Sequence, residues 1–187
     1  MQALFTTRLM LRRWRASDRE PFARLNRDPK VMEFMPARLT TEESDRLIDR
    51  IEACFDQRGF GLWAAELRES SAFIGFIGLS IPRFEAHFTP AVEIGWRLAH
   101  EYWGRGLATE GARSVIHFAF NDFALPALVS FTTTGNFRSR RVMEKLGMAH
   151  DPRDDFDHPT LPENHPLRPH VLYRLANPAA QGPFLSP

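Results

Sequence analysis

The sequence predicts one α/β domain, in which a sheet carries helices on its faces. Three observations support this class. An early segment alternates apolar and charged side chains, later segments carry apolar side chains at helical spacing, and a glycine-rich turn joins a strand to the best-defined helix. The chain has 187 residues, 43% of them hydrophobic and 25% charged, which suits a single sizeable core. We expect one domain over residues 1–176 and a disordered tail over residues 177–187.

The chain begins with a strand and two helices. Residues 8–14 alternate apolar and charged side chains in their first half, as a half-buried strand does. Residues 17–18 then offer an N-cap for a first helix. A second helix is expected from a cap at residue 40 or 41 to Gly59, because glycine commonly follows a helix C-terminus.

Strands dominate the middle of the chain. Residues 60–67 and 72–79 flank a short polar turn, so they predict an antiparallel hairpin. Residues 91–98 predict the next strand. The hairpin and this strand would form the centre of the sheet.

Helices and strands alternate in the remainder. Apolar residues at helical spacing make residues 105–120 the best-defined helix, and residues 128–132 read as a short strand. A further helix is expected over residues 136–146, ending before Gly147, and a last strand over residues 170–175. These elements complete the expected α/β order.

Charge and cysteine content exclude several functional classes. The formal net charge is +1, so nothing in it favours a nucleic acid or a membrane as partner. The single cysteine, Cys54, cannot form an internal disulfide and suits a reducing compartment. No apolar run near the N-terminus is long enough for a signal peptide or a membrane span. We therefore expect a cytoplasmic protein with a small-molecule or peptide substrate.

The chemistry concentrates in a strand and the glycine-rich turn after it. Residues 92–98 read as the strand, and Gly104 and Gly106 lead into the long helix. Glycine lets a ligand approach the backbone closely, and the unpaired amides of a helix N-terminus attract an anion. The turn is therefore suited to a pyrophosphate group.

Other ligand-binding turns fit these residues less well. A P-loop requires Lys and then Ser or Thr after its last glycine, whereas Leu107 and Ala108 follow Gly106. A dinucleotide-binding turn requires glycine where Thr109 stands, and the next strand lacks the acidic residue that would hold a ribose. A purely structural turn stays open on the residues alone.

The turn also resembles a known family. Residues 103–108, Trp-Gly-Arg-Gly-Leu-Ala, are similar to motif A of the GNAT acetyltransferases, which reads Gln/Arg-x-x-Gly-x-Gly/Ala and whose amides hold the coenzyme A pyrophosphate. Trp103 replaces the usual Gln or Arg at the first position. The resemblance therefore implies binding through the backbone.

Further matches in the family's order extend the resemblance over residues 8–175. Residues 136–148 resemble the Asn-x-x-Ser element, ending in Gly-Met, of the branch that includes the RimJ/RimL ribosomal-protein acetyltransferases. Residues 6–12 match that branch's Thr-x-Arg-Leu-x-Leu-Arg opening, residues 28–29 its Asp-Pro, and residues 73–78 its Gly-x-Ile-Gly strand. The resemblance implies the GNAT fold, a central mixed and largely antiparallel sheet that is splayed where the coenzyme inserts, with helices on both faces.

The resemblance implies acetyl-CoA as donor and an amine as acceptor. The acceptor is expected to be a protein N-terminus or a small amine, acetylated by direct transfer in a ternary complex. A non-catalytic acyl-CoA-binding module is the alternative, and a homodimer is left open. Contacts to the coenzyme are expected from Ile94, Trp96, Trp103, Gly104, Arg105, Gly106, Leu107, Ala108, Thr109, Asn136 and Arg140.

Two residues are candidates for proton transfer. Glu93 lies in the strand before the turn, where a carboxylate among apolar neighbours is suited to take the amine proton directly or through water. The alternative is a strand glutamate that pairs with an arginine or faces solvent. Asn136 and Ser139 share one side of a helix start, and the resemblance makes Ser139 a proton donor to the departing thiolate. Asn136 also fits an ordinary N-cap.

The remaining reactive side chains receive no catalytic role. Cys54 flanks a core stripe with no histidine near it in sequence, which disfavours an acetyl-enzyme. The histidines and aspartates around residues 151–169 match no zinc spacing, so no metal is expected. This segment reads as a loop whose Phe156, Asp157 and His158 would shape the amine pocket.

Overall fold

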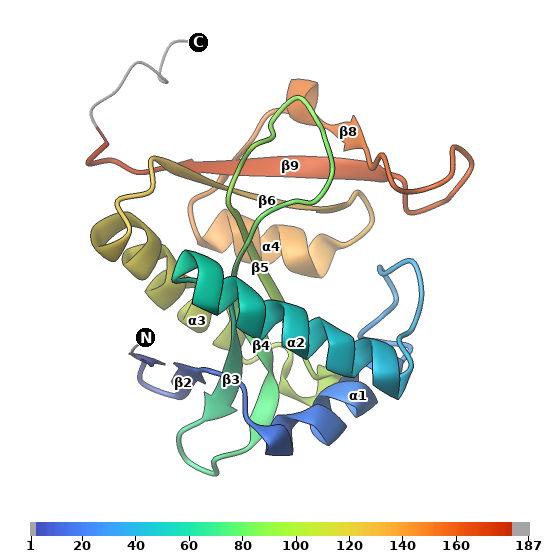
Figure 1. Cartoon of the computed structure of the whole chain (residues 1–187). Coiled ribbons are helices and arrows are strands. Elements are labelled where there is room, and N and C mark those ends of the chain that lie inside the picture. Colours follow the sequence, from blue (N-terminus) through green and yellow to red (C-terminus); the bar gives the residue numbers. More distant parts are fainter. Residues whose placement is uncertain (1–2, 181–187) are drawn as a thin grey trace.

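The structure is a computed structural model that describes residues 3–180, and it contains one mixed sheet with helices against both faces (Figure 1). The strand order is β1-β2-β3-β4-β5-β6-β9-β7, with β8 also paired to β9. The strands are β1 (Leu4–Phe5), β2 (Leu9–Arg12), β3 (Leu62–Leu67), β4 (Phe73–Ser80), β5 (Glu93–Leu98), β6 (Ala127–Thr133), β7 (Ala149–His150), β8 (Phe156–Asp157) and β9 (Pro169–Ala176).

Within residues 3–180, four α-helices accompany the sheet. They are α1 (Arg19–Arg27), α2 (Thr41–Arg58), α3 (Leu107–His117) and α4 (Phe137–Lys145). Short 3₁₀ turns occur at Ala16–Asp18, His100–Tyr102 and Pro152–Asp154, and a π-helical turn at Phe118–Asp122 follows α3.

The helices divide between the two faces of β4. Phe22 of α1 packs against Phe76, with 6.0 Å between the ring centroids. The next residue, Ile77, points to the opposite face because side chains alternate along a strand, and there it lies so close to Gly111 of α3 that a Cβ would overlap it. All strand pairs are antiparallel except β5–β6. The predicted mixed, largely antiparallel sheet with helices on both faces is confirmed.

Local chemistry explains where the helices begin and end. At α2, the Thr40 hydroxyl accepts a hydrogen bond from the Glu43 amide, the Glu43 carboxylate accepts one from the Thr40 amide, and Gly59 ends the helix at φ 75°. This confirms the second helix. Helix α3 begins at Leu107 rather than at the predicted residue 105, because Gly106 adopts φ 77° and interrupts helical geometry.

Asp18 occupies the predicted N-cap position of the first helix, but its side chain does not act as the cap. A 3₁₀ turn over Ala16–Asp18 precedes α1, and the Asp18 side chain makes no cap bond to α1. Its carboxylate instead accepts two hydrogen bonds from the Arg12 guanidinium, at 2.7 and 2.8 Å. Asp18 was therefore assigned to the helix by its residue type, whereas its function is to neutralise a buried arginine.

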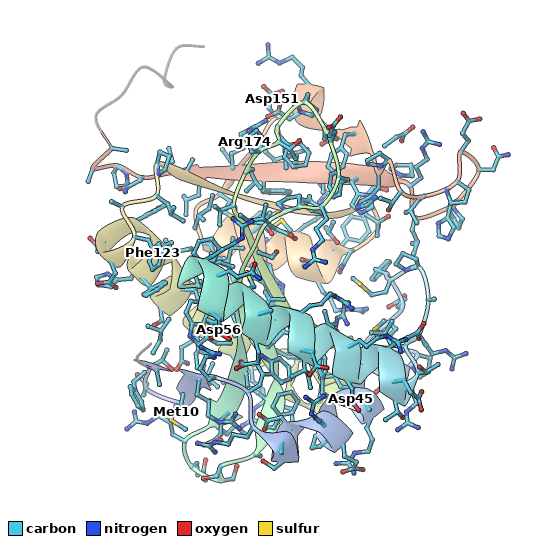
Figure 2. The ribbon with its side chains drawn as sticks, in the orientation of Figure 1. Met10, Asp45, Asp56, Phe123, Asp151 and Arg174 are labelled. Carbon is cyan, nitrogen blue, oxygen red and sulfur yellow. The ribbon has the colours of Figure 1, made fainter. Side chains whose placement is uncertain are left out.

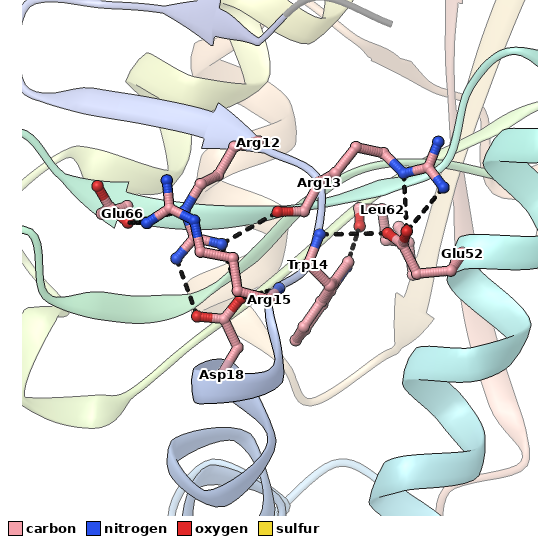
Figure 3. A network of polar contacts seen from close by, with 8 residues as sticks. All are labelled: Arg12, Arg13, Trp14, Arg15, Asp18, Glu52, Leu62 and Glu66. Atoms are coloured by element: carbon pink, nitrogen blue, oxygen red, sulfur yellow. Dashed lines mark hydrogen bonds and ion pairs between the residues drawn. The ribbon is translucent and has the colours of Figure 1, made fainter.

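Arg12 is the centre of a buried ionic network that joins β2, β3 and the turn before α1 (Figure 3). Its side chain is 7% exposed and also donates to Glu66 of β3 at 2.7 Å. The next residue, Arg13, pairs with Glu52 and Asp56 of α2. The network therefore connects the N-terminal edge of the sheet to the helix that covers it.

The C-terminal part of the chain is more regular than expected. The segment 151–169, predicted as a loop, contains a 3₁₀ turn and β8, which pairs with β9. Asn177, predicted to begin the tail, is 7% exposed and donates to the carbonyls of Phe120 and Leu125. We therefore propose that the single domain includes Asn177, while residues 181–187 of the expected tail lie outside the described residues.

Candidate functional site

The site forms where β5 and β6 part. Only Glu93 and Val129 pair across these strands within residues 3–180, and Val129 donates its amide to the Val92 carbonyl at 2.9 Å. In Figure 1, β5 runs up the molecule whereas β6 and β9 run across its upper part. Because backbone groups alternate in direction along a strand, Trp96 directs its N–H and C=O toward the same side as Val92, past the end of the pairing. The exposed edge of β5 is therefore available to a ligand.

A first cavity, about 470 Å³ in volume, lies along this edge. Its walls are β5, the turn before α3, the first half of α4 and the segment after α1. Nine of the sequence-predicted site residues line it: Trp96, Trp103, Gly104, Gly106, Leu107, Ala108, Thr109, Asn136 and Ser139. The structure thus brings together two segments that are about 30 residues apart in the chain.

The turn before α3 presents backbone amides to the cavity. Gly104 and Gly106 have φ values of 73° and 77°, a region that side chains disfavour. The first helical hydrogen bond of α3 runs from the Glu110 amide to the Gly106 carbonyl, so the amides of residues 107–109 precede it and lack helical partners. Unpaired amides at a helix N-terminus bind phosphate oxygens, so these amides are suited to a pyrophosphate.

Basic side chains surround the same cavity. It is lined by Lys30, Arg97, Arg138, Arg141 and Lys145, and no acidic residue is among its described lining residues. Arg97 is half-buried, and burial lowers its pKa to about 10. The positive lining matches the negative charge of a phosphate-bearing ligand. Three of these side chains belong to α4, and sequence reasoning missed all five because exposed basic residues are common in this chain.

A clamp from the connection between β1 and β2 holds the turn in place. Thr6 and Arg8 both donate to the Glu110 carboxylate of α3, at 2.6 and 2.8 Å. The Arg8 guanidinium also donates to Glu110 at 2.6 Å and to the Arg105 carbonyl at 2.9 Å. The segment 6–12, which matched the family in sequence, therefore also has a structural role. Sequence reasoning missed this role because the partner, Glu110, lies about 100 residues further along the chain.

Trp103 has a structural role as well. Its indole N–H donates to the Leu98 carbonyl at 2.7 Å, and the Arg138 guanidinium lies 4.6 Å from its ring centre. The side chain thus covers the end of β5 and connects it to α4. A tryptophan at this position is compatible with backbone binding by the turn.

Asn136 is the N-cap of α4. Its side-chain oxygen accepts from the Ser139 amide at 3.2 Å, and its amide nitrogen donates to the Thr132 hydroxyl at 3.0 Å. This arrangement matches the capping interpretation, and a contact to a ligand is an additional role that stays a prediction. Ser139 lies in the first turn of the helix and lines the cavity.

Three predicted coenzyme contacts lie outside the lining of the first cavity. Ile94 is fully buried in the core. Arg105 is exposed, with its guanidinium 5.7 Å from the ring centre of Tyr102. Arg140 points the other way along α4, toward Tyr173 and the Thr134 carbonyl. Helix geometry explains the last case, since consecutive residues face directions about 100° apart.

Glu93 lines a second cavity, of about 800 Å³, between α2 and the ends of β3, β4 and β6. The side chain is half-buried, and desolvation of its carboxyl group raises the pKa to about 7. A hydrogen bond from the Ser80 hydroxyl, at 2.9 Å, opposes this shift. An acid with a pKa near neutrality is suited to general base catalysis. Glu93 also forms the β5–β6 pair, and it precedes Trp96, which lines the first cavity, by three residues in β5.

The three residues expected to shape the acceptor pocket differ in position. His158 lines the second cavity, and burial followed by repulsion from His170 lowers its pKa. Phe156 lies behind it in an aromatic cluster, 4.9 Å from the Phe88 ring centre. Asp157 is exposed and pairs with Arg168. Only His158 of the three therefore reaches the cavity surface.

Within residues 3–180, no three or more His, Cys, Asp or Glu side chains are grouped so that they could hold a metal ion. In the same part of the chain, no helix is long and apolar enough to cross a membrane.

Known proteins resemble this chain in sequence and structure. Residues 8–149 match the family described as "Acetyltransferase (GNAT) domain". The uncharacterized protein YkkB of Bacillus subtilis is 30% identical over 78% of this chain and 84% of its own. The FsC-acetyl coenzyme A-N(2)-transacetylase of Aspergillus fumigatus is 31% identical over 79% of this chain and 65% of its own.

A solved structure extends the likeness to the whole fold. RimL, a ribosomal L7/L12 alpha-N-protein acetyltransferase in complex with coenzyme A, superposes with a TM-score of 0.76 over 94% of this chain and 98% of its own. The identity is 14%, so this likeness concerns the fold alone.

Proposed function

Because the chain belongs to the GNAT family and is an acetyl-CoA-dependent acetyltransferase, we propose that it transfers the acetyl group directly to a primary amine. The acceptor is a protein N-terminus or a small amine, and both substrates bind before transfer. Direct transfer requires that donor and acceptor meet in one place.

The parting of β5 and β6 is the observation that supports this proposal. On one side lies the cavity with the amide-rich turn and basic lining, and on the other lies the cavity that holds Glu93. A coenzyme in the first cavity and an amine in the second would approach each other at the gap. Cys54 lines the second cavity, but direct transfer assigns it no acyl-carrying role.

We assign coenzyme binding to the walls of the first cavity and to the neighbouring residues. The amides after Gly106 would hold the pyrophosphate, and the Trp96 backbone would bind the pantetheine arm as an added strand does. Asn136 would contact the same arm through the hydrogen-bonding capacity that its cap leaves over. Three predicted contacts have side chains outside the cavity lining: Ile94, Arg105 and Arg140. Each would contact the coenzyme only through its backbone or after its side chain moved.

Proton transfer is assigned to Glu93 and Ser139. Acetyl-CoA supplies the thioester carbonyl that the amine attacks. Glu93 accepts the proton of the amine, directly or through a water molecule, as its ionised form allows. As the carbon–sulfur bond breaks, Ser139, in the first turn of α4, donates a proton to the leaving sulfur and regains one from solvent.

The proposal is tested by measuring coenzyme A thiol release with acetyl-CoA and a panel of small amines and N-terminal peptides. We expect release that depends on the acceptor, with a product that mass spectrometry shows to be acetylated at its amine. Tight coenzyme binding without turnover on any acceptor would instead favour the non-catalytic binding module. Acetylation of Cys54 during turnover would contradict direct transfer.

A further inference from the structure

Acidic and basic residues of α2 lie on different sides of the helix. Acidic residues follow one another on α2 at spacings of three and four residues: Asp45, Asp49, Glu52 and Asp56. The first two pair with Arg19 of α1, and the last two with Arg13, which directly follows β2. Figure 2 shows Asp45 and Asp56 along the edge of α2 nearest α1 and β2. The acidic side of the helix is thus used in holding the fold together.

The other side of α2 carries arginines and faces the second cavity. Arg50 and Arg58 line it from α2, and Arg83 lines it from the connection between β4 and β5. Among residues 3–180, none of the three arginines forms an ion pair with an acidic side chain. Arg50 also follows Arg46 by one helical turn, a repulsive spacing. Arg58 benefits from its place in the last turn of the helix, but Arg50 and Arg83 have no such local explanation.

The rest of the cavity has a different character. Phe84, Phe131 and Ile51 give it apolar walls, and Glu93 is the only acidic residue among its described lining residues. The cavity thus combines arginines, apolar walls and a carboxyl group that can accept a proton. A ligand that complements it has three matching features. These are an anionic group, an apolar body and an amine.

We propose that the acceptor amine carries an anionic group, a carboxylate or a phosphate, which Arg50 and Arg83 bind while Glu93 receives the amine. Guanidinium groups pair with both anions through two parallel hydrogen bonds. The inference rests on the proposed acetyl transfer and specifies its acceptor. It distinguishes this second cavity from the first, whose basic residues serve the coenzyme.

Matched acceptors that differ only in charge test the inference. L-phenylalanine is compared with L-phenylalaninamide, and O-phosphoethanolamine with ethanolamine, by kcat/KM for thiol release. We expect at least one anionic acceptor to exceed its neutral partner by about tenfold or more, mainly through a lower KM. The amide has the less basic amine, so ease of deprotonation alone would favour it over the acid. Equal kcat/KM within both pairs would overturn the inference but leave acetyl transfer intact.

Arginine variants assign the preference to the cavity. In the double variant Arg50→Gln/Arg83→Gln, we expect the anionic preference to fall to about twofold or less while the Kd for coenzyme A stays unchanged. Arg46→Gln is the matched control, since Arg46 lies on the same helix but outside the cavity lining, and it should keep the preference. A double variant that retains the full preference would overturn the inference.

A binding measurement separates this inference from the proposed function. Cys54 lines the cavity, so a bound acceptor should slow its alkylation by iodoacetamide. We expect protection by the anionic acceptor of the preferred pair and little by its neutral partner, even if no acceptor is turned over. Equal protection by both members would overturn the inference, whereas absent turnover with selective protection would overturn only the proposed transfer.

Discussion

Glu93 couples the proposed activity to pH. Its carboxyl group must be ionised to accept a proton, and burial raises its pKa to about 7. The active form is therefore lost as pH falls through about 7, and we expect kcat to show an acidic limb there. Glu93→Gln should lower kcat by about 10²-fold or more and remove the limb, measured as thiol release from pH 5.5 to 9. An unchanged limb in this variant would exclude Glu93 as the base.

The same pKa predicts how Glu93 affects folding. The folded state binds the Glu93 proton more tightly than the unfolded chain does, because its pKa is raised from 4.5 to about 7. The resulting stabilisation is complete below about pH 4.5 and is lost as pH rises through about 7. Glu93→Gln should therefore be at least as stable as the wild type at pH 8, which thermal unfolding measures. A large loss of stability at that pH would contradict the assigned desolvation.

Ser80 should tune the acidic limb. Its hydroxyl donates to the Glu93 carboxylate, a hydrogen bond that favours the ionised form and lowers the pKa. Ser80→Ala removes this bond, so the limb should move to higher pH while kcat at its alkaline plateau is largely retained. A pH profile of kcat distinguishes this from a structural defect, which would lower the plateau without moving the limb.

Single residues were predictable from sequence where position along the chain determines their role. Glu93 follows from a carboxylate placed in an apolar strand before the turn, and Asn136 follows from its type at a helix start. Arg50 and Arg83 could not be found this way, because only the folding of α2 over the sheet brings them to one cavity. Arg140 shows the converse limit, since proximity to Ser139 in sequence does not place both on one face of α4.

At the scale of elements, the position of the first turn of α3 depends on the connection between β1 and β2. Arg8→Gln removes the bonds from its guanidinium to Glu110 and to the Arg105 carbonyl, which hold the glycine turn. We expect the Kd for coenzyme A to rise by about tenfold, measured calorimetrically, because the amides lose their fixed geometry. Arg24→Gln is the control, since its exposed pair with Glu20 lies on α1. An unchanged Kd would show that the turn is rigid without the clamp.

Elements were predictable in proportion to their length and capping chemistry. Helix α2 was found because Thr40, Glu43 and Gly59 mark both of its ends. Strands β1, β7 and β8 were missed, since two residues each are too short to show periodicity and each depends on pairing with a longer strand. The parting of β5 from β6 came only from the family resemblance, because no local pattern encodes where a pairing stops.

At the scale of the whole molecule, the Arg12 network holds the N-terminal edge of the sheet to the turn before α1. Arg12, Asp18 and Glu66 have side chains no more than 7% exposed. A buried ion pair contributes little beyond an apolar replacement, but removal of one partner leaves the other charges buried without compensation. Arg12 serves both buried carboxylates, and Glu66 has a second pair with Arg15 at 2.9 Å, so the loss of Arg12 affects Asp18 most (Figure 3).

Arg12→Met should therefore destabilise the fold by about 3–5 kcal/mol, because the buried Asp18 carboxylate loses its cation and Glu66 keeps only the partly exposed Arg15. Urea denaturation at pH 7 measures the loss, and Arg24→Met, which breaks an exposed pair, should cost about 0.5 kcal/mol or less. The triple change Arg12→Met/Asp18→Leu/Glu66→Leu should recover much of the stability, because no charge is then left buried. If the triple variant were less stable than Arg12→Met, the cost would arise from packing rather than from uncompensated charge.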